Sequence, residues 1–518
     1  MNADSPYSVN DSAMLQEARR RWMQRDWAEA LEQFERACRA EPRNARAKLE
    51  YARALGQRYE VDRAEAILGE LSEATARAPE LAAAVAQSFR MIHRPERALA
   101  RLEALRAAGC LTPPLLGELA VLYEQCHRLE EAREAIEACL SAAGGQPEPS
   151  LVLARILRLS GEVREASQRL ESLLDGPPVS PQLGVRAWYE LAAARDAQED
   201  YAGAVQAVER GKAIQRTLPE ALRLRQRNQE VNRYFASLYA SLDPAMRDAW
   251  RRMLEDAGEQ SQPIAHLLGF PRSGTTLLEQ MLDAHPRLVS SSERPVFARE
   301  VFPAMASGVG EPVTVDSLNG LSAETLRTLR SRYLRMMEAM LGESIDGRMH
   351  LDKNPNHTCL AVGLYRLFPE SRFLCALRDP RDVVVSAYLQ YFPLTEFSVS
   401  TLTWEGAANQ YVTDMACGAR MEAWLGDAWQ RVRYEDLVAD PRRTLEGVLA
   451  GLGLDWEAAV DDYRERRRGA LVHSPSRAAV RDTLHRRSIG RWRHYARWLQ
   501  PVLATLRPAC VAWGYDPE

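Results

Sequence analysis

The residues best suited to chemistry in this chain form a glycine loop at 269–276, with the sequence GFPRSGTT. An apolar run at 264–268 precedes the loop, and further apolar residues follow it at helical spacing. This pattern predicts a buried strand, a tight turn, and a helix whose first backbone N–H groups point at an anion. Nucleotide-binding loops of the GxxxxGK[ST] type space their glycines in the same way, but Thr275 stands where that pattern has lysine, and Arg272 lies inside the loop. The loop therefore predicts a phosphate site, and the missing lysine makes ordinary ATP or GTP hydrolysis the less favoured chemistry.

A second group of polar residues lies in the segment LRDPRDVVVSAYLQYF at 377–392. The apolar stretch at 373–377 predicts a buried strand, and Asp379, Pro380 and Asp382 predict a helix start with a cap, a proline and an acid. Arg378 then lies at the carboxyl end of a strand, where open parallel sheets bind ligands. Ser386 lies on the second turn of the helix, so the two side chains can hold one phosphate. An ordinary ion pair between Arg378 and an aspartate is the alternative.

Lysine is rare in this chain, which has only Lys48, Lys212 and Lys353 among its 67 basic residues. Arginine supplies almost every other cation. Lys353, in HLDKNPNH, indicates a position where a compact ammonium is needed and a planar guanidinium does not serve. Chance placement is the competing interpretation.

An internal repeat occupies the segment 1–215. Equal intervals separate a series of alanines, and a larger apolar residue follows each of them by four positions; the alanines are Ala30, Ala64, Ala98, Ala132 and Ala166. A sixth copy, at Ala204, follows after a slightly longer interval. A small residue at a fixed position allows paired helices to approach closely, so the period predicts a stacked helical solenoid. Its concave face is either a docking surface for a protein or peptide, or part of a spacer or homo-oligomer contact.

Composition and spacing together predict a multidomain α and α/β protein. We expect an all-α repeat solenoid at 1–215, a charged helical connector at 216–259, and an α/β domain with a central parallel sheet at 260–518. The formal charge of −4 gives no reason to expect nucleic-acid binding.

Cysteine usage and apolar runs bear on the compartment. The eight cysteines are scattered without a CxxC pair, which is typical of reduced thiols and indicates no metal cage. The segment 1–20 lacks a signal-peptide pattern, and the sequence contains no apolar run of the length that crosses a bilayer. These features predict a cytoplasmic protein without a membrane span.

The motifs resemble those of known families. The repeat period resembles that of tetratricopeptide repeats, and Trp27, Ala30, Phe34, Ala37 and Pro42 in the first copy match that family's aromatic, small and proline positions. GFPRSGTT with LLEQMLDAHP, and RDPRDVVVS with AYLQYF, resemble the two elements with which sulfotransferases hold 3′-phosphoadenosine 5′-phosphosulfate (PAPS). The resemblance continues through RVRYEDLVADP at 431–441 and HRRSIGRW at 485–492.

The combination of the two parts is similar to bacterial tetratricopeptide-repeat sulfotransferases. Within the superfamily the sequence resembles tyrosylprotein sulfotransferases most closely, through its first element and its closing WGYDPE at 513–518.

This resemblance implies a sulfotransferase that moves a sulfuryl group from PAPS to an acceptor hydroxyl on a peptide tyrosine, a glycan or a small molecule, leaving 3′-phosphoadenosine 5′-phosphate (PAP) and using no metal. It implies catalytic roles for Glu293, as general base, and for Lys353 and Arg272, as cations at the transferred group. It implies a nucleotide site formed by Arg272, Ser273, Gly274, Thr275, Thr276, Arg378, Ser386, Tyr434, Arg487, Ser488, Gly490 and Arg491. Cations aimed at the departing phosphate oxygen lower the barrier because charge gathers there in the transition state.

Two departures from the family pattern bear on the acceptor. Many cytosolic sulfotransferases use a catalytic histidine, and no histidine here stands in that register. Animal tyrosylprotein sulfotransferases are membrane-anchored and carry disulfides, and the sequence predicts neither feature for this chain.

A kinase with a phosphate-binding loop, and a catalytically inert repeat scaffold, are the alternative functions.

Overall fold

The computed structural model describes residues 13–74, 78–144, 146–258, 260–463 and 486–517. The segment 1–12 and the motif residues His485 and Glu518 lie outside the described residues. The chain divides into two compact units, one of residues 1–152 with 335–344 and one of residues 153–334 with 345–518. The predicted domain boundaries at 215 and 259 remain a prediction.

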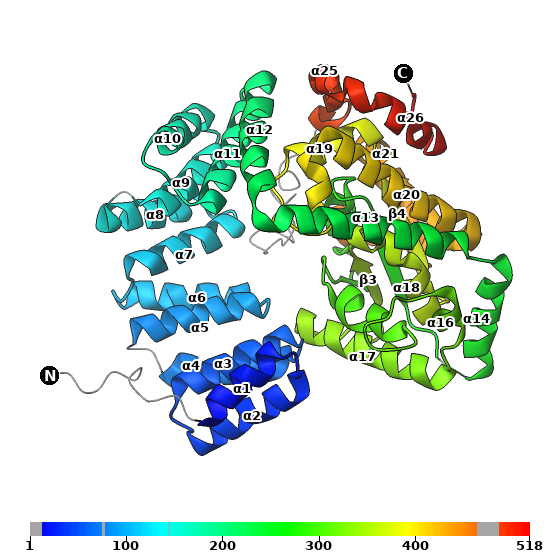
Figure 1. The fold of residues 1–518 in the computed structure, drawn as a ribbon, viewed down its shortest axis with the longest axis horizontal. Helices are drawn as coiled ribbons and strands as arrows, with labels where there is room; N and C mark the ends of the chain where they lie inside the picture. The colour runs from blue at the N-terminus through cyan, green and yellow to red at the C-terminus, as the bar shows by residue number, and fades with distance from the viewer. Residues whose placement is uncertain (1–12, 75–77, 145, 259, 464–485, 518) are drawn as a thin grey trace. The chain divides into compact units, whose positions relative to one another are not determined.

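The first unit is built from helices that pack in successive pairs, α1 with α2, α3 with α4, α5 with α6, and α7 with α8 (Figure 1). Prolines at the first position of α5, α6 and α7 start these helices, since proline has the right φ angle and needs no N–H there. The helices are α1 (Ala13–Met23), α2 (Trp27–Ala40), α3 (Ala45–Gln57), α4 (Val61–Ala74), α5 (Pro79–Met91), α6 (Pro95–Ala107), α7 (Pro113–Gln125) and α8 (Leu129–Ala143).

The repeated alanines occupy equivalent positions, because each lies on the second helix of a pair and is fully buried. Their larger apolar partners four residues later are buried as well, from Phe34 to Val208. The turn before each second helix also repeats: a residue in it adopts a left-handed φ, at Arg25, Tyr59, His93, His127, Gly161 and Glu199. The predicted helical repeat is confirmed by this shared register.

Helices continue into the second unit. Helix α9 (Pro147–Leu159) spans the division between the units, and α11 packs against both α10 and α12. The predicted connector is helical, as two helices separated at Ser241–Asp243 rather than one. The helices are α10 (Val163–Asp175), α11 (Pro181–Ala197), α12 (Tyr201–Thr217), α13 (Pro219–Ala240) and α14 (Pro244–Asp256).

A sheet of five parallel strands in the order β2-β3-β1-β4-β5 forms the centre of the second unit. The strands are β1 (Ile264–Gly269), β2 (Leu288–Ser290), β3 (Met349–Lys353), β4 (Arg372–Leu377) and β5 (Trp429–Arg433). The central strand β1 is buried along its whole length, as its apolar sequence predicts. It pairs Leu267 with Lys353 of β3 and Gly269 with Ala376 of β4, so the carboxyl ends of these strands meet at one edge.

Helices flank the sheet (Figure 1). Apolar residues of α15, β1, α21 and α22 form one continuous buried core with it. The helices of this part are α15 (Thr275–Leu282), α16 (Val315–Asn319), α17 (Ala323–Leu341), α18 (Ala361–Leu367), α19 (Pro380–Leu389), α20 (Trp404–Leu425), α21 (Tyr434–Ala439), α22 (Pro441–Gly451), α25 (Ala496–Leu499) and α26 (Leu503–Ala512). Within the described residues, no helix is both long enough and apolar enough to span a bilayer.

Candidate active site

The carboxyl edge of the sheet gathers the polar residues singled out from the sequence. Arg272 follows β1, Glu293 follows β2, Lys353 ends β3, Arg378 follows β4 and Tyr434 follows β5. Each strand thus delivers one side chain to the same edge, where an open parallel sheet places its ligands. Chain topology therefore brings together residues that are far apart in the sequence.

The glycine loop has the close approaches that its glycines predict. Gly269 has a φ of 141°, and a Cβ there would lie 2.6 Å from the carbonyl oxygen of Ala376. Gly274 has a φ of 99°, and a Cβ there would lie 2.6 Å from Cδ2 of Tyr434. A side chain at either position is excluded both by the backbone conformation and by the neighbour. The loop is therefore fixed between β4 and Tyr434, and the predicted strand, turn and helix follow one another as expected.

Arg272 and Arg378 lie side by side at this edge. Nη1 of Arg378 donates a hydrogen bond to the backbone carbonyl of Arg272 at 3.3 Å, and Nε of Arg272 donates to Oγ of Ser386 at 3.0 Å. The Ser386 hydroxyl thus links the two predicted motifs directly, while its expected sharing of a phosphate with Arg378 stays a prediction. The helix start is as predicted, with the Asp379 side chain capping α19 and Pro380 in its first position.

Positive charge is concentrated around Arg272. Burial, followed by the nearby guanidinium groups of Arg378 and Arg491, lowers the pKa of Arg272 to about 10. Glu293 acts in the opposite direction but does not outweigh these effects. Arg378 and Arg491 therefore both repel the charge of Arg272. An anionic ligand at this position would relieve that repulsion.

The segment at 486–495 closes one side of the arginine cluster formed by Arg272, Arg378 and Arg491. Nη2 of Arg378 donates to the carbonyl of Ser488, and the backbone N–H groups of Gly490 and Trp492 each donate to Asp382 at 2.7 Å. Asp382, predicted only as a helix-start acid, therefore anchors the segment.

The structure also contains an ion pair of Arg378 and shows the exposure of Arg487. Asp382 lies 3.8 Å from Arg378, so the ion pair considered as an alternative role for Arg378 does occur. Arg487 lies exposed on the short helix Arg486–Ser488, at the edge of the segment.

Tyr434 packs against the loop and the cluster. Its ring lies near the guanidinium of Arg378, with the Cζ atom 5.2 Å from the ring centroid. The ring is also the neighbour that excludes a side chain at Gly274. A cation–π contact of this kind holds the arginine in place. The adenine contact expected for Tyr434 remains a prediction.

Lys353 lies between two carboxylates. Its Nζ is 2.7 Å from Oε1 of Glu293 and 3.0 Å from Oε2 of Glu279, and its side chain has no exposed surface. Burial lowers the pKa of Lys353, but the two carboxylates outweigh it and raise that pKa above its usual value. Lys353 is therefore held as a cation in a dry position.

Glu279 is a site residue that the sequence interpretation missed. It lies on α15, and the hydroxyls of Ser290 and Ser292 donate to it at 2.7 and 3.3 Å. The available signal was a lone acid on a helix that is buried along its whole length. Its partner Lys353 lies on β3, far away in the sequence, so the local pattern alone could not assign Glu279 to the site.

The residue before Lys353 is also polar and buried. Asp352 accepts a hydrogen bond from the Tyr333 hydroxyl at 2.9 Å, and lies 3.8 Å from His266 and 3.7 Å from His357. These histidines are packed into the domain interior, where they support the strand ends. His285 is buried as well and contacts the carbonyl of Asp455 at 2.9 Å.

The loop has the features of an anion site. Oγ of Ser273 is buried without a hydrogen-bond partner, and Nε of Arg378 is likewise unpartnered. Thr275 begins α15, and the first backbone N–H groups of a helix have no acceptor within the helix itself. A phosphate or sulfate group would satisfy these donors. Among the described residues, no group of three or more His, Cys, Asp or Glu side chains is arranged to hold a metal ion.

Comparisons with known proteins find a family match for each part of the chain. Residues 263–458 match the model of a sulfotransferase family, and residues 21–88 and 151–219 match tetratricopeptide-repeat models. The chain therefore carries a sulfotransferase-family domain together with tetratricopeptide repeats. Both parts of the resemblance drawn from the motifs are confirmed.

Individual relatives are distant. An uncharacterized protein of Aquifex aeolicus is 27% identical over 66% of this chain and 44% of its own length, so this chain spans less than half of that relative. Protein-tyrosine sulfotransferase 2 of Gallus gallus is 26% identical over 50% of this chain and 71% of its own length. The solved sulfotransferase domain of the Synechococcus PCC 7002 olefin synthase is 23% identical over 45% of this chain and 88% of that domain, with a TM-score of 0.33.

Proposed function

We propose that this chain, with its tetratricopeptide repeats and sulfotransferase-family domain, transfers a sulfuryl group from PAPS to the hydroxyl of an acceptor. The observation that carries the proposal is the meeting of Arg272, Arg378 and Lys353 at one sheet edge, with Glu293 2.7 Å from the Lys353 ammonium. Arg378 fits a phosphate at one end of such a ligand, and Arg272 with Lys353 fits the charged group at the other end.

Two donors without a hydrogen-bond partner, Oγ of Ser273 and Nε of Arg378, support the fit to a bisphosphorylated nucleotide. The buried hydroxyl of Ser273 and the start of α15 suit the 5′ end, where PAPS supplies the sulfuryl group. Arg378 and Ser386, near Arg272, suit the 3′-phosphate.

The remaining predicted residues take supporting places in this arrangement. The cradle for the 5′ end consists of the backbone and side chains of Ser273, Gly274, Thr275 and Thr276. We place Ser488, Gly490 and Arg491 beside the 3′-phosphate, and Tyr434 and Arg487 at the nucleoside.

The chemistry of transfer assigns each residue a task. Glu293 accepts the proton of the acceptor hydroxyl while that oxygen forms its bond to sulfur. The bond between sulfur and the bridging phosphate oxygen breaks, and its electron pair stays on the phosphate of PAP. Lys353 and Arg272 stabilise the charge that develops there, and one well-placed donor of this type is worth about 3 kcal/mol of barrier. The chain's own cations offset this charge, so we propose a reaction without a metal.

We propose tyrosine in a peptide as the first acceptor to test. Its support is that the Gallus gallus relative and similar relatives from other animals are named protein-tyrosine sulfotransferases. A phenol is also acidic enough for a single carboxylate to deprotonate during attack. Sugar and small-molecule hydroxyls are the other acceptors. We propose that the repeat helices present the acceptor, since repeat solenoids commonly bind peptides on one face.

Location and assembly are part of the same proposal. All eight cysteines are free thiols, which supports a reducing, cytoplasmic setting. Contact between copies through the repeats, as a homo-oligomer, is proposed as well.

A calorimetric titration tests the nucleotide. The full chain is titrated with PAP in the absence of metal and, separately, with ATP and magnesium. We expect PAP to bind in the micromolar range or tighter and ATP with magnesium to bind far more weakly. Preference for ATP with magnesium would instead favour a kinase, and binding of neither would favour an inert scaffold.

A transfer assay tests the activity. Radiolabelled PAPS is incubated with the chain and either a tyrosine peptide or the same peptide with phenylalanine, and label on the peptide is counted. Label on the tyrosine peptide alone supports the proposal. Label on neither, with PAP binding intact, would redirect the search to sugar and small-molecule hydroxyls.

A further inference from the structure

The segment that carries Arg491 is held from two sides. On one side, Asp382 of α19 accepts hydrogen bonds from the backbone N–H groups of Gly490 and Trp492. On the other, Asp196 at the end of α11 lies 2.5 Å from Nη2 of Arg491 and accepts a hydrogen bond from the Tyr495 hydroxyl. The segment thus lies between the carboxylate of Asp382 on α19 and the carboxylate of Asp196 on the repeat helix α11.

The next repeat helix contacts the same segment. Tyr201, the first residue of α12, stacks on His494 with ring centroids 4.5 Å apart and meets the edge of Tyr495 at 5.4 Å. Both α11 and α12 belong to the compact unit that contains the sheet. The position of the segment therefore depends on the last repeat as well as on the α/β domain.

The charge of Arg491 matters to the proposed site. Burial disfavours this cation, but Asp196, followed by Tyr495, outweighs burial and raises the pKa of Arg491. Arg491 in turn is one of the two cations that act on Arg272. Asp196 is the carboxylate that compensates this third cation and fixes its direction.

A second contact reaches the helix of Ser386. Glu209 of α12 accepts a hydrogen bond from the hydroxyl of Tyr388, which lies two residues after Ser386 on α19. Lys212, further along α12, lies with its Nζ 4.0 Å from the centre of the Tyr388 ring and donates to the carbonyl of Thr401. The last repeat thus contacts both elements that border the arginine cluster.

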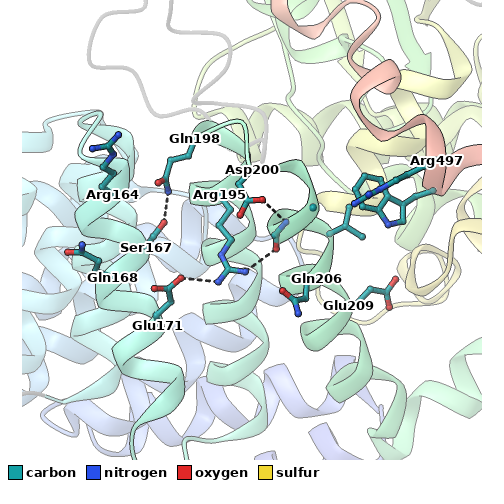
Figure 2. A pocket seen from close by; sticks show the side chains of 14 residues that line it. Arg164, Ser167, Gln168, Glu171, Arg195, Gln198, Asp200, Gln206, Glu209 and Arg497 are labelled. Atoms are coloured by element: carbon teal, nitrogen blue, oxygen red, sulfur yellow. Dashed lines mark hydrogen bonds and ion pairs between the residues drawn. The ribbon is translucent and has the colours of Figure 1, made fainter.

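A pocket of about 990 Å³ is lined by residues of α10, α11, α12 and α25, and it includes none of the candidate site residues. Figure 2 shows Arg195 near its centre, paired with Glu171 at 2.9 Å, and Gln198 bonded to Ser167 at 2.7 Å. Its three arginines are matched by three acids, so its charge favours no ligand class; they are Arg164, Arg195, Arg497, Glu171, Asp200 and Glu209. The contact that bears on the nucleotide site is therefore not in this pocket. It is the ion pair of Asp196, the residue after Arg195, with Arg491.

We propose that the last repeat is a working part of the nucleotide site, in which Asp196 is a positioning residue that holds Arg491 beside Arg272 and Arg378. The proposal rests on the proposed function, because it takes Arg378 and Arg491 as the residues beside the 3′-phosphate. Without Asp196, Arg491 is repelled by Arg272 and turns away from the cluster. The nucleotide then loses a charged donor.

The test compares PAP affinity in full-length variants. Asp196→Asn keeps an acceptor for Tyr495 but loses the charge, and Asp196→Glu restores the charge one methylene further out. Glu199→Gln is the matched control. Glu199 lies three residues after Asp196 and outside the proposed site, so this variant removes a nearby carboxylate that should not affect PAP binding. Melting temperatures are measured alongside to report folding.

We expect Asp196→Asn to weaken PAP binding about tenfold, the size of one charge-assisted hydrogen bond. Asp196→Glu should recover most of the affinity, and Glu199→Gln should bind as the unmodified chain does. If Asp196 only supported the fold, Asp196→Asn would lower the melting temperature, and Asp196→Glu would not recover PAP affinity. Unchanged or tighter binding by Asp196→Asn overturns the proposal, because loss of a negative charge would then simply favour an anion.

Two outcomes keep this proposal separate from the proposed function. If the unmodified chain binds no PAP, the proposed function fails. If it binds PAP and Asp196→Asn binds equally well, only the role of the repeat fails. Should Asp196→Asn not fold, Tyr495→Phe serves instead, since it removes the hydroxyl that donates to Asp196. Weaker PAP binding without loss of melting temperature supports the proposal, and unchanged PAP binding rejects it.

Discussion

Lys353 and Glu293 are joined twice. The side chains meet at 2.7 Å between Nζ and Oε1, and the backbone N–H of Glu293 donates to the carbonyl of Lys353 at 2.7 Å. Glu293 also adopts a left-handed φ of 47°, an uncommon conformation for a glutamate. The proposed cation and the proposed base are therefore held as one unit, with the strain kept at the site.

The first prediction concerns Glu293→Gln. The Glu293 side chain is 26% exposed and its amide replacement is isosteric, so we expect the fold and PAP affinity to change little. Removing the base should lower the rate of transfer about 10²- to 10⁴-fold. Single-turnover transfer from PAPS measures the rate, and calorimetry with PAP measures affinity. A variant that transfers at the original rate removes Glu293 from the mechanism.

The second prediction concerns Lys353→Ala, which should lower the transfer rate about 10²- to 10³-fold. It should also destabilise the chain by about 3–5 kcal/mol, because Glu279 is left as a buried, uncompensated charge. Urea unfolding measures this loss.

A double variant separates these two effects. Adding Glu279→Gln to Lys353→Ala neutralises the remaining buried carboxylate, so we expect stability to recover while transfer stays slow. Recovery of both would mean that Lys353 acts only through the fold. Recovery of neither would mean that Glu279 does not carry the cost.

The third prediction concerns Arg378→Ala and the 3′-phosphate. Arg378 is buried beside Arg272, so its loss should weaken PAP binding about 100-fold. Binding of AMP, which lacks a 3′-phosphate, should change much less. The matched control is Arg372→Gln, at the exposed opposite end of β4. Equal loss for PAP and AMP would place the 3′-phosphate elsewhere.

Local signals account for what the sequence predicted. The glycine loop, the Asp379–Pro380 helix start and the register of the repeated alanines each depend on a few neighbouring residues, and the structure contains all three. The parallel sheet then brings Arg272 and Arg378 together, as expected from strands ending in polar residues.

Contacts between distant segments could not be predicted in this way. Glu279 gains its meaning only where α15 meets the end of β3, and Asp196 contacts Tyr495, which lies 299 positions further along the chain. The hydrogen bond between Arg272 and Ser386 joins the two motifs because packing, and not its own sequence, sets the orientation of α19. Tertiary packing decided these partners.

The last prediction concerns the buried Lys212 and pH. Burial lowers the pKa of Lys212 to about 7, from an ordinary value of 10.5. Between these two values the unfolded chain holds a proton on Lys212 that the folded chain has released, so stability rises with pH in this window. Below about pH 7 both states are protonated and the cost of burying the charge is constant, and above pH 10.5 both are neutral and the cost is gone.

Lys212→Met removes this titration. We expect the unfolding free energy of Lys212→Met to exceed that of the unmodified chain by the largest amount near pH 7. By pH 10 this advantage should be smaller, because the unmodified chain becomes more stable as the pH rises. Urea unfolding at pH 7, 8, 9 and 10 measures it, with Lys48→Met as control, since Lys48 is a partly exposed lysine paired with Glu70. Parallel curves for the variant and the unmodified chain would mean that Lys212 keeps its proton across this range, and that α12 meets Tyr388 through a charged lysine.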